Sequence, residues 1–303
     1  MAVVLSTDLH LPTDIADGIV QKAKTGSSVA ALSGQEPMRF GKLDIITFDD
    51  DLTAEFVEET GAKGSDDAKP DVKTAVPHKA VVQMRTSDEF LIADEDYQLH
   101  ILDEYEVKCA RALARGLDLG LYYRINPRTG NPIPEWTNYL NSTTKRVEIT
   151  TTSQADLDFE AAAGLVIGDG FSLNGVAFDP KYAWKLSTAR FADGRKKYPE
   201  LGLGAEISSF EGVPAAVSST VSAKAKDGDA TDNKVRAILG NYRSGIRWGV
   251  QRSFPFKILE YGDPDNTGRD LAGHNEILLR AEIIYGWYVF ADQFAVIEDA
   301  VTP

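Results

Sequence analysis

The chain has 303 residues, of which 43% are hydrophobic and 26% charged, and its formal net charge is −14. This is the composition of a globular protein with a sizeable core. No apolar run reaches the roughly 18 to 20 residues of a membrane span. The excess of acidic residues argues against binding nucleic acid through its phosphates. The single cysteine, Cys109, excludes an internal disulfide, and the four scattered histidines leave no zinc spacing.

The N-terminal segment is predicted to form an arm over roughly the first 35 residues, because large apolar side chains are sparse there. Ser, Thr, Ala and Gly are frequent instead, as in residues 24–28. A segment of this kind buries too little apolar surface to order by itself. We therefore expect it to become ordered only against a partner.

A long hairpin is predicted next. Residues 38–57 have a strand-like pattern, residues 58–77 are rich in charge and glycine and nearly empty of apolar side chains, and a strand resumes at residues 80–84. Two strands separated in this way predict an extended, solvated hairpin whose tip, around residues 61–70, does not fold on its own.

The clearest helix is predicted over residues 97–123. It would span about 27 residues and roughly 40 Å, and it should end near Asn126 and Pro127, because proline disfavours helix in the residue before it. Its apolar stripe, at spacings of three, four or seven, consists of Leu99, Leu102, Cys109, Leu113, Leu117 and Leu121. Asp118 lies off this stripe, and Cys109 is expected to be a buried small hydrophobe rather than a nucleophile.

Two shorter helices and a series of strands follow. One helix should begin at a Ser153 cap, with Asp156 in its first turn, and the other at Asp179, with Pro180 at the first helical position. Strands are predicted at residues 213–217, 235–239, 246–250, 253–261, 277–290 and 294–297, and residues 262–268 are an acidic connection between two of them. The chain is thus expected to be of the α+β class.

The order of these elements resembles the HK97-type major capsid proteins of tailed bacteriophages, over about residues 27–298. The stretches that carry the resemblance are residues 176–186 (VAFDPKYAWKL), 193–195 (DGR) with Tyr198, 210–214 (FEGVP), 237–242 (AILGNY) and 246–249 (IRWG). They are similar to an apolar strand, a helix capped by Asp-Pro, a loop with Asp-Gly, a strand after Gly-Val-Pro, and a strand, turn and strand in that family.

The resemblance implies an HK97-like capsid fold. The implied parts are an N-terminal arm (1–37), an extended hairpin loop with flanking strands (38–84), a peripheral domain that includes a long spine helix (85–130 and 251–303), and an axial domain (131–250). Residues 58–79 would lie across a neighbouring subunit, residues 193–205 near the capsomer centre, and residues 263–275 near the three-fold contacts.

The function that this resemblance implies is structural. Hexamers and pentamers of the chain would form an icosahedral shell around double-stranded DNA, without sequence-specific binding, in a virion assembled in the host cytoplasm. A portal protein and decoration proteins are implied partners. The best-known member carries a scaffolding segment ahead of its arm, whereas this chain starts almost directly with the arm, so a separate scaffolding protein is expected.

Two alternatives remain open at this point. An encapsulin-type nanocompartment shares the fold, although such shells usually begin with a helix that takes cargo peptides rather than with an arm. A mixed α/β enzyme would need convergent acid, base or nucleophile groups, and the sequence offers none. We therefore predict no catalytic, cofactor-binding or metal-binding residue.

Several sequence motifs are similar to functional sites. Some members of the family join neighbouring subunits by an isopeptide bond between a lysine of the extended loop and an asparagine of the peripheral domain. The candidates here are Lys63, Lys69, Lys73 and Lys79 with Asn266 and Asn275. Solvated lysines are the simpler interpretation. Asp263, Asp265, Thr267 and Gly268 match the start of a calcium loop, but His274 stands at the twelfth position, where glutamate is required, so a polar turn is expected.

The remaining motifs have simpler explanations. Residues 168–170 (GDG) lack the third glycine of a dinucleotide turn, because Leu173 stands there. His100 and Asp103 are expected to be a surface pair on the long helix. Residues 49–51 (DDD) are expected to be a solvated turn without the partners of a two-metal site.

Overall fold

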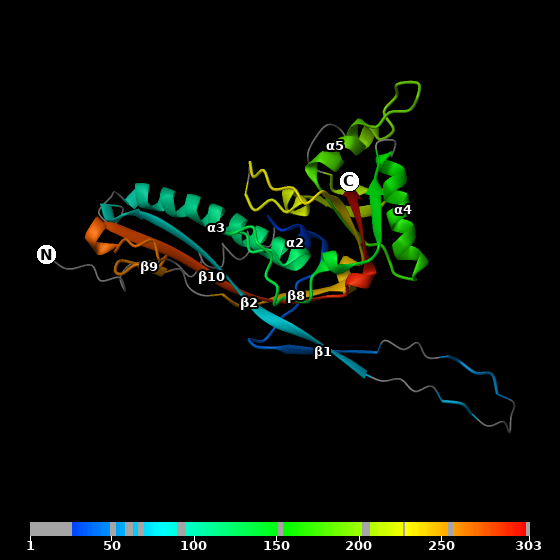
Figure 1. The fold of residues 1–303 in the computed structure, drawn as a ribbon, viewed down its shortest axis with the longest axis horizontal. Coiled ribbons are helices and arrows are strands. Elements are labelled where there is room, and N and C mark those ends of the chain that lie inside the picture. The colour runs from blue at the N-terminus through cyan, green and yellow to red at the C-terminus, as the bar shows by residue number, and fades with distance from the viewer. Residues whose placement is uncertain are drawn as a thin grey trace.

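The computed structural model describes residues 26–48, 53–57, 63–65, 70–89, 95–150, 154–201, 207–226, 228–253 and 257–300, without the side chains of residues 48, 95–101 and 103. Figure 1 shows an elongated molecule with a body of two sheets, a long helix along one of them, and a hairpin that projects from the body.

The first sheet is antiparallel and has the strand order β1-β2-β10-β8, with β9 also paired to β10. Its strands are β1 (Leu43–Phe48), β2 (Pro70–Ser87), β8 (Ile246–Ser253), β9 (Lys257–Leu259) and β10 (Glu276–Val289). Residues 70–75 of β2 pair with β1, and residues 76–87 pair with β10. One strand therefore belongs to both the projecting hairpin and the body.

Helix α3 (Glu95–Tyr123) covers one face of this sheet and confirms the predicted long helix. The residues of its stripe whose side chains the structure describes are buried, with Leu113, Leu117 and Leu121 at most 2% exposed. The hydroxyl of Tyr105 donates to the carbonyl of Leu279, 2.9 Å away, and so ties the helix to β10. The helix ends at Tyr123, as predicted, and Arg124 after it adopts a left-handed conformation (φ 53°).

The second sheet has the order β3-β11-β7-β4-β6-β5. Its strands are β3 (Arg146–Ile149), β4 (Gly175–Phe178), β5 (Ser209–Phe210), β6 (Val213–Val217), β7 (Val235–Gly240) and β11 (Phe294–Asp299). Successive residues of its strands point to opposite faces. Ile238 and Val296 join the core beneath α3, while Leu239 and Ile297 join a second core under α4 and α5.

Helices α4 (Ala155–Gly168) and α5 (Pro180–Thr188) begin differently from one another. The α5 prediction is confirmed, because the Asp179 carboxylate accepts from the N–H of Lys181 at 2.9 Å. The predicted Ser153 cap of α4 is wrong: Gln154 holds the cap position and makes no side-chain cap bond, and Ser153 lies outside the described residues. Asp156 lies in the first turn, as expected.

The remaining elements are short. They are α2 (Ser28–Leu32), α6 (Tyr242–Gly245) and 3-10 turns at Leu140–Ser142, Pro199–Leu201, Ser219–Ser222, Ala272–His274 and Ala291–Gln293. Among the helices that the structure describes, none has the length and apolar character that crossing a bilayer would demand.

Two sequence predictions are wrong in extent. Strand β2 begins at Pro70 rather than near residue 80, because pairing with β1 organises polar residues that have no apolar run of their own. Residues 27–38 are not a free arm: Val29, Leu32 and Met38 are at most 9% exposed and belong to the chain's own core. Residues 1–25 lie outside the described part.

Candidate functional site

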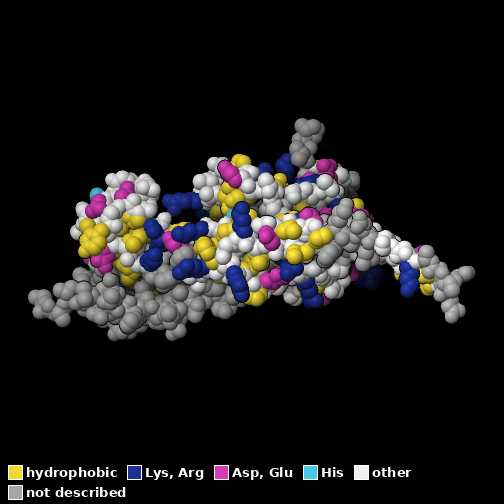
Figure 2. Space-filling model, turned by 90° about the horizontal axis from the view of Figure 1, so that it is seen from below, with side chains coloured by type: hydrophobic (Ala, Val, Ile, Leu, Met, Phe, Trp, Pro, Cys, Tyr) yellow, Lys and Arg dark blue, Asp and Glu magenta, His cyan; other side chains and the backbone are white. Residues whose placement is uncertain are grey.

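The projecting hairpin presents apolar side chains to solvent. Ile46 on β1 and Val72 on β2 are directly paired across the two strands and are 66% and 53% exposed. Val76, farther along the same face of β2, is also exposed, whereas Ile45 and Ala75 on the opposite face are buried. In Figure 2 a hydrophobic group lies beside a Lys or Arg side chain toward the end of this projection. Apolar groups gathered in this way are typical of an interaction surface.

Beyond the paired strands, residues 53–57 carry a fully exposed aromatic side chain, Phe56. The neighbouring Glu55 carboxylate accepts from the N–H of Gly64 at 2.9 Å and so links the two sides of the loop. A phenylalanine ring that contacts only water adds no burial energy to its own chain. Its apolar surface is free to be buried by another molecule.

The base of the hairpin is held by a histidine between two indoles. The ring of His78 lies 4.0 Å, centroid to centroid, from both Trp136 and Trp287. A Cβ at Gly120 of α3 would come within 3.0 Å of Trp287 and 3.2 Å of Trp136, so the helix also packs closely here. Burial lowers the pKa of His78 to about 4. The imidazole is therefore neutral at pH 7, which suits its place between two apolar rings.

A buried carboxylate holds the N-terminal segment against α3. Asp118 is fully buried, and its two oxygens accept from the hydroxyl of Ser27, the N–H and hydroxyl of Ser28 (3.1 and 2.8 Å), the N–H of Val29 (3.2 Å) and the hydroxyl of Thr220 (2.7 Å). Burial raises the pKa of Asp118, and the hydrogen bonds from Ser27, Thr220 and Ser28 act in the opposite direction. One side chain thus joins α2, α3 and the turn at Ser219–Ser222.

The same segment then runs along β8. The indole N–H of Trp248 donates to the Ser33 hydroxyl at 2.9 Å, and the N–H of Glu36 donates to the Trp248 carbonyl at 2.8 Å. The approach is so close that a Cβ at Gly249 would stand 2.2 Å from the Glu36 carbonyl oxygen. Glycine is therefore required at this position of β8.

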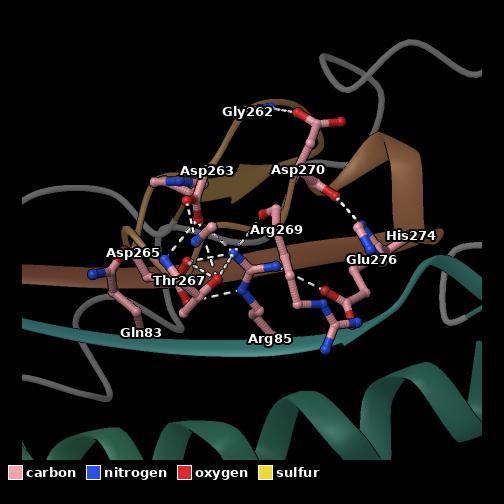
Figure 3. Close-up of polar contacts among 12 residues, drawn as sticks. Gln83, Arg85, Gly262, Asp263, Asp265, Thr267, Arg269, Asp270, His274 and Glu276 are labelled. Atoms are coloured by element: carbon pink, nitrogen blue, oxygen red, sulfur yellow. Dashed lines mark hydrogen bonds and ion pairs between the residues drawn. The ribbon is translucent and has the colours of Figure 1, made fainter.

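An arginine of β2 organises the acidic loop, defined as residues 262–275 (Figure 3). Arg85 donates to both carboxylate oxygens of Asp265, to Asp263 at 2.9 Å and to Glu276 at 2.8 Å. These contacts raise the pKa of Arg85, and Arg85 in turn holds the pKa of Asp265 well below its ordinary value. The loop is therefore fastened to a strand that continues into the hairpin.

The candidate residues that the sequence suggested have separate structural roles. Cys109 is buried, as predicted, and burial raises the pKa of its thiol to about 11. The predicted turn at residues 263–268 is confirmed, and its carboxylates bind Arg85. Among the described residues no group of three or more His, Cys, Asp or Glu side chains could hold a metal ion.

The lysine candidates do not lie together. Lys73 pairs with Asp71 inside β2, and Lys79 pairs with Glu282 of β10 at 2.9 Å. Lys63 is exposed, and Lys69 lies outside the described residues. Asn266 and Asn275 occupy left-handed turn positions (φ 54° and 53°). No contact between these lysines and asparagines is seen within the described part of this one chain, so cross-linking stays a prediction.

The other motifs are structural or outside the described residues. Asp169 of the 168–170 motif caps the end of α4 and pairs with Lys145 at 2.6 Å. The side chains of His100 and Asp103, and the whole of residues 49–51, lie outside the description.

Three polar residues that join distant elements, Asp118, Arg85 and His78, were not predicted from the sequence. Asp118 was placed off the buried stripe, which is wrong, since it is fully buried. Its position between Leu117 and Leu119 was the available signal, because a charge flanked by core leucines needs a buried set of donors. The sequence contains no comparable signal for Arg85.

No protein-family model and no curated protein matches the chain. Among solved structures, a chain from Mycobacterium phage Ogopogo is 38% identical, with a TM-score of 0.79 over 90% of this chain and 92% of that chain. The chain belongs to the phage major capsid proteins.

Other structures agree with this family at greater distance. A chain from Gordonia phage Cozz is 28% identical, with a TM-score of 0.77 over 91% of this chain and 87% of that chain. The capsid of a native GTA particle is 16% identical, with a TM-score of 0.57 over 91% of each chain, and so shows the fold alone. Major capsid proteins are structural proteins, and the enzyme alternative is therefore overturned.

Proposed function

We propose that this major capsid protein tiles a closed icosahedral shell, as hexamers and pentamers, around the double-stranded DNA of a tailed phage, and that its fold is of the HK97 type. The observation that carries the proposal is the projecting hairpin. Its paired apolar residues Ile46 and Val72 are more than half exposed, and Phe56 is fully exposed. Contact with a neighbouring copy would bury these side chains.

The HK97-type parts can be assigned to the observed elements. Residues 1–37 would be the arm, of which residues 27–37 dock on the chain's own body, and residues 38–84 the extended loop. Residues 85–130 and most of 251–303 would form the peripheral domain with α3 as spine helix, and residues 131–250 the axial domain. Strand β11 (Phe294–Asp299) pairs with β7 and β3, so we assign it to the axial sheet rather than to the peripheral domain.

Partners and location follow from the proposed role. A separate scaffolding protein, a portal protein and decoration proteins would complete the particle, which would assemble in the host cytoplasm. The net charge of −14 suits a wall that contains DNA without gripping it, because like charges repel phosphates. Loop residues 193–205 would face the capsomer centre and the acidic loop the three-fold contacts.

Negative-stain electron microscopy with light scattering on the purified protein, alone and with its co-expressed scaffold, tests the proposal. Closed icosahedral particles or five- and six-membered rings are expected. Particles filled with enzyme cargo would favour an encapsulin-type compartment of the same fold. A monomer that stays compact under every assembly condition would contradict the proposal.

A further inference from the structure

The geometry around Arg85 is that of a coordination site. Four oxygens surround its Nη2 atom: a carboxylate oxygen of Asp263 at 2.9 Å, one of Asp265, the hydroxyl of Thr267 at 2.7 Å and the main-chain carbonyl of Arg269 at 2.9 Å. A guanidinium nitrogen of this kind carries only two hydrogens. The loop therefore directs more acceptors at this point than two ordinary hydrogen bonds can use.

The spacing of these oxygens has a known counterpart. Calcium loops supply ligands from positions 1, 3 and 5 through side chains and from position 7 through its carbonyl, with glycine at position 6 for the sharp turn. Asp263 at position 1 places Gly268 at position 6, and Gly268 has a φ of 80°. Figure 3 shows the acidic loop curled around the end of the Arg85 side chain.

We propose that Arg85 is the built-in cation of a calcium-type loop, with its Nη2 atom at the position that the metal ion occupies in such loops. The wild-type acidic loop then needs no metal to fold. The other guanidinium nitrogens fasten the filled loop to the sheet, since Nε bonds Asp265 and Nη1 bonds Glu276 of β10, each at 2.8 Å.

The ion pairs of the cluster place one cation between the two loop carboxylates. Asp263 and Asp265 both pair with Arg85, whereas Arg269 pairs with Glu276, which Arg85 also contacts. Without Arg85 the repulsion among the carboxylates would be largely uncompensated. The loop would then open unless another cation entered.

Amide hydrogen exchange of residues 257–280, measured with calcium and with a chelator, tests the proposal. The wild-type loop should show the same protection in both buffers. In Arg85→Ala the loop should exchange at least about tenfold faster in chelator, and calcium on the order of millimolar should restore part of the protection. Magnesium should restore less, because it demands a tighter octahedral set of ligands.

Two further variants separate charge from hydrogen bonding and protect the test against a misfolded Arg85→Ala. Arg85→Lys keeps a compact cation and should retain most of the loop protection. Arg85→Gln keeps hydrogen-bond donors without charge and should lose it. Arg146→Ala is the matched control, because Arg146 is also a partly buried arginine, paired with Glu298 at 2.6 Å in the other sheet, and its removal should leave the loop unchanged.

Three results would overturn the proposal. One is a wild-type loop whose protection falls in chelator, because a metal rather than Arg85 would then order it. Another is an Arg85→Gln loop as protected as wild type. The third is an Arg85→Ala loop that opens but does not respond to calcium, because the cation position would then be specific to guanidinium geometry. The readout is local to the loop and does not depend on shell assembly.

Discussion

The body buries its key side chains within the chain, whereas the projecting hairpin exposes apolar side chains to solvent. In the body, a charged group as deeply buried as Asp118 has five donors from its own chain, and the apolar stripe of α3 is covered by β10 and its neighbours. In the hairpin, Ile46, Val72 and Phe56 face solvent. We therefore expect the body to be stable alone and the hairpin to contribute to contact with other subunits, so substitutions in the two regions should have different readouts.

The largest effect on stability is expected for Asp118→Ala. The change leaves several buried donors without an acceptor, so the free energy of unfolding of the unassembled chain should fall by about 3 to 5 kcal/mol. Denaturant unfolding followed by circular dichroism measures it. Glu104→Ala, on the exposed face of the same helix, is the control and should change stability by less than about 0.5 kcal/mol. An equal effect of both variants would contradict the role of Asp118.

A smaller effect, dependent on pH, is expected from His78 at the junction of the two regions. Its pKa is lowered to about 4 in the folded chain from an ordinary value of 6.5. Between these values the unfolded chain binds a proton that the folded chain does not, so this group's stabilisation is present above pH 6.5 and is lost as the pH falls toward 4.

His78→Phe should remove this contribution. Stability profiles are measured by urea unfolding between pH 7 and pH 4, and the wild type should lose stability relative to His78→Phe as the pH falls. The carboxylates common to both proteins cancel in the difference between the profiles. A difference that stays constant over this range would show that His78 titrates normally.

The next prediction concerns the rate at which the buried thiol of Cys109 reacts. Cys109 is 1% exposed and its pKa is raised to about 11, so both access and ionisation oppose its reaction. In the native chain an aromatic disulfide reagent should modify it slowly, and in denaturant at once. Rapid modification of the native chain, measured by absorbance, would mean that α3 opens far more often than its packing implies.

The smallest change in stability, and the sharpest test of the comparison, is expected in the hairpin. The double variant Ile46→Ser, Val72→Ser should alter the free energy of unfolding by less than about 0.5 kcal/mol, because both side chains already face water. Particle yield, measured by sedimentation and electron microscopy, should fall strongly. Asp44→Asn on the same hairpin face is the control and should assemble normally.

A different outcome would erase the distinction between the two regions. If the Ile46 and Val72 variant assembled as the wild type does, the exposed apolar face would not be a contact surface. If it unfolded in isolation, the hairpin would be part of the body's own stability.

The predictable parts of the fold are those whose signal is local. The spacing of leucines identified α3, the Asp179–Pro180 pair identified the start of α5, and apolar runs identified β7, β10 and β11. The start of β2 at Pro70 could not be predicted, because residues 70–79 gain their strand geometry from β1 and β10 rather than from their own composition.

The contacts of Asp118 and Arg85 could not be predicted either, because their partners are far away in the sequence. Ser27 lies 91 residues from Asp118, and Arg85 lies 180 residues from Asp265. Pairing between such distant residues depends on where the folded backbone places them. From the sequence, Asp118 was therefore placed only off the apolar stripe, and the Asp263 to Gly268 turn matched the start of a calcium loop without its final ligand.

By itself, the sequence determined the long helix, the helix cap at Asp179 and the acidic turn at residues 263–268, because apolar periodicity and turn chemistry act over a few neighbouring residues. Only the tertiary structure decided that Asp118 is buried, that residues 27–38 dock on the body, and that Arg85 fills the acidic loop. Those outcomes depend on burial and on charges brought together from distant parts of the chain, and neither is encoded in any short stretch of residues.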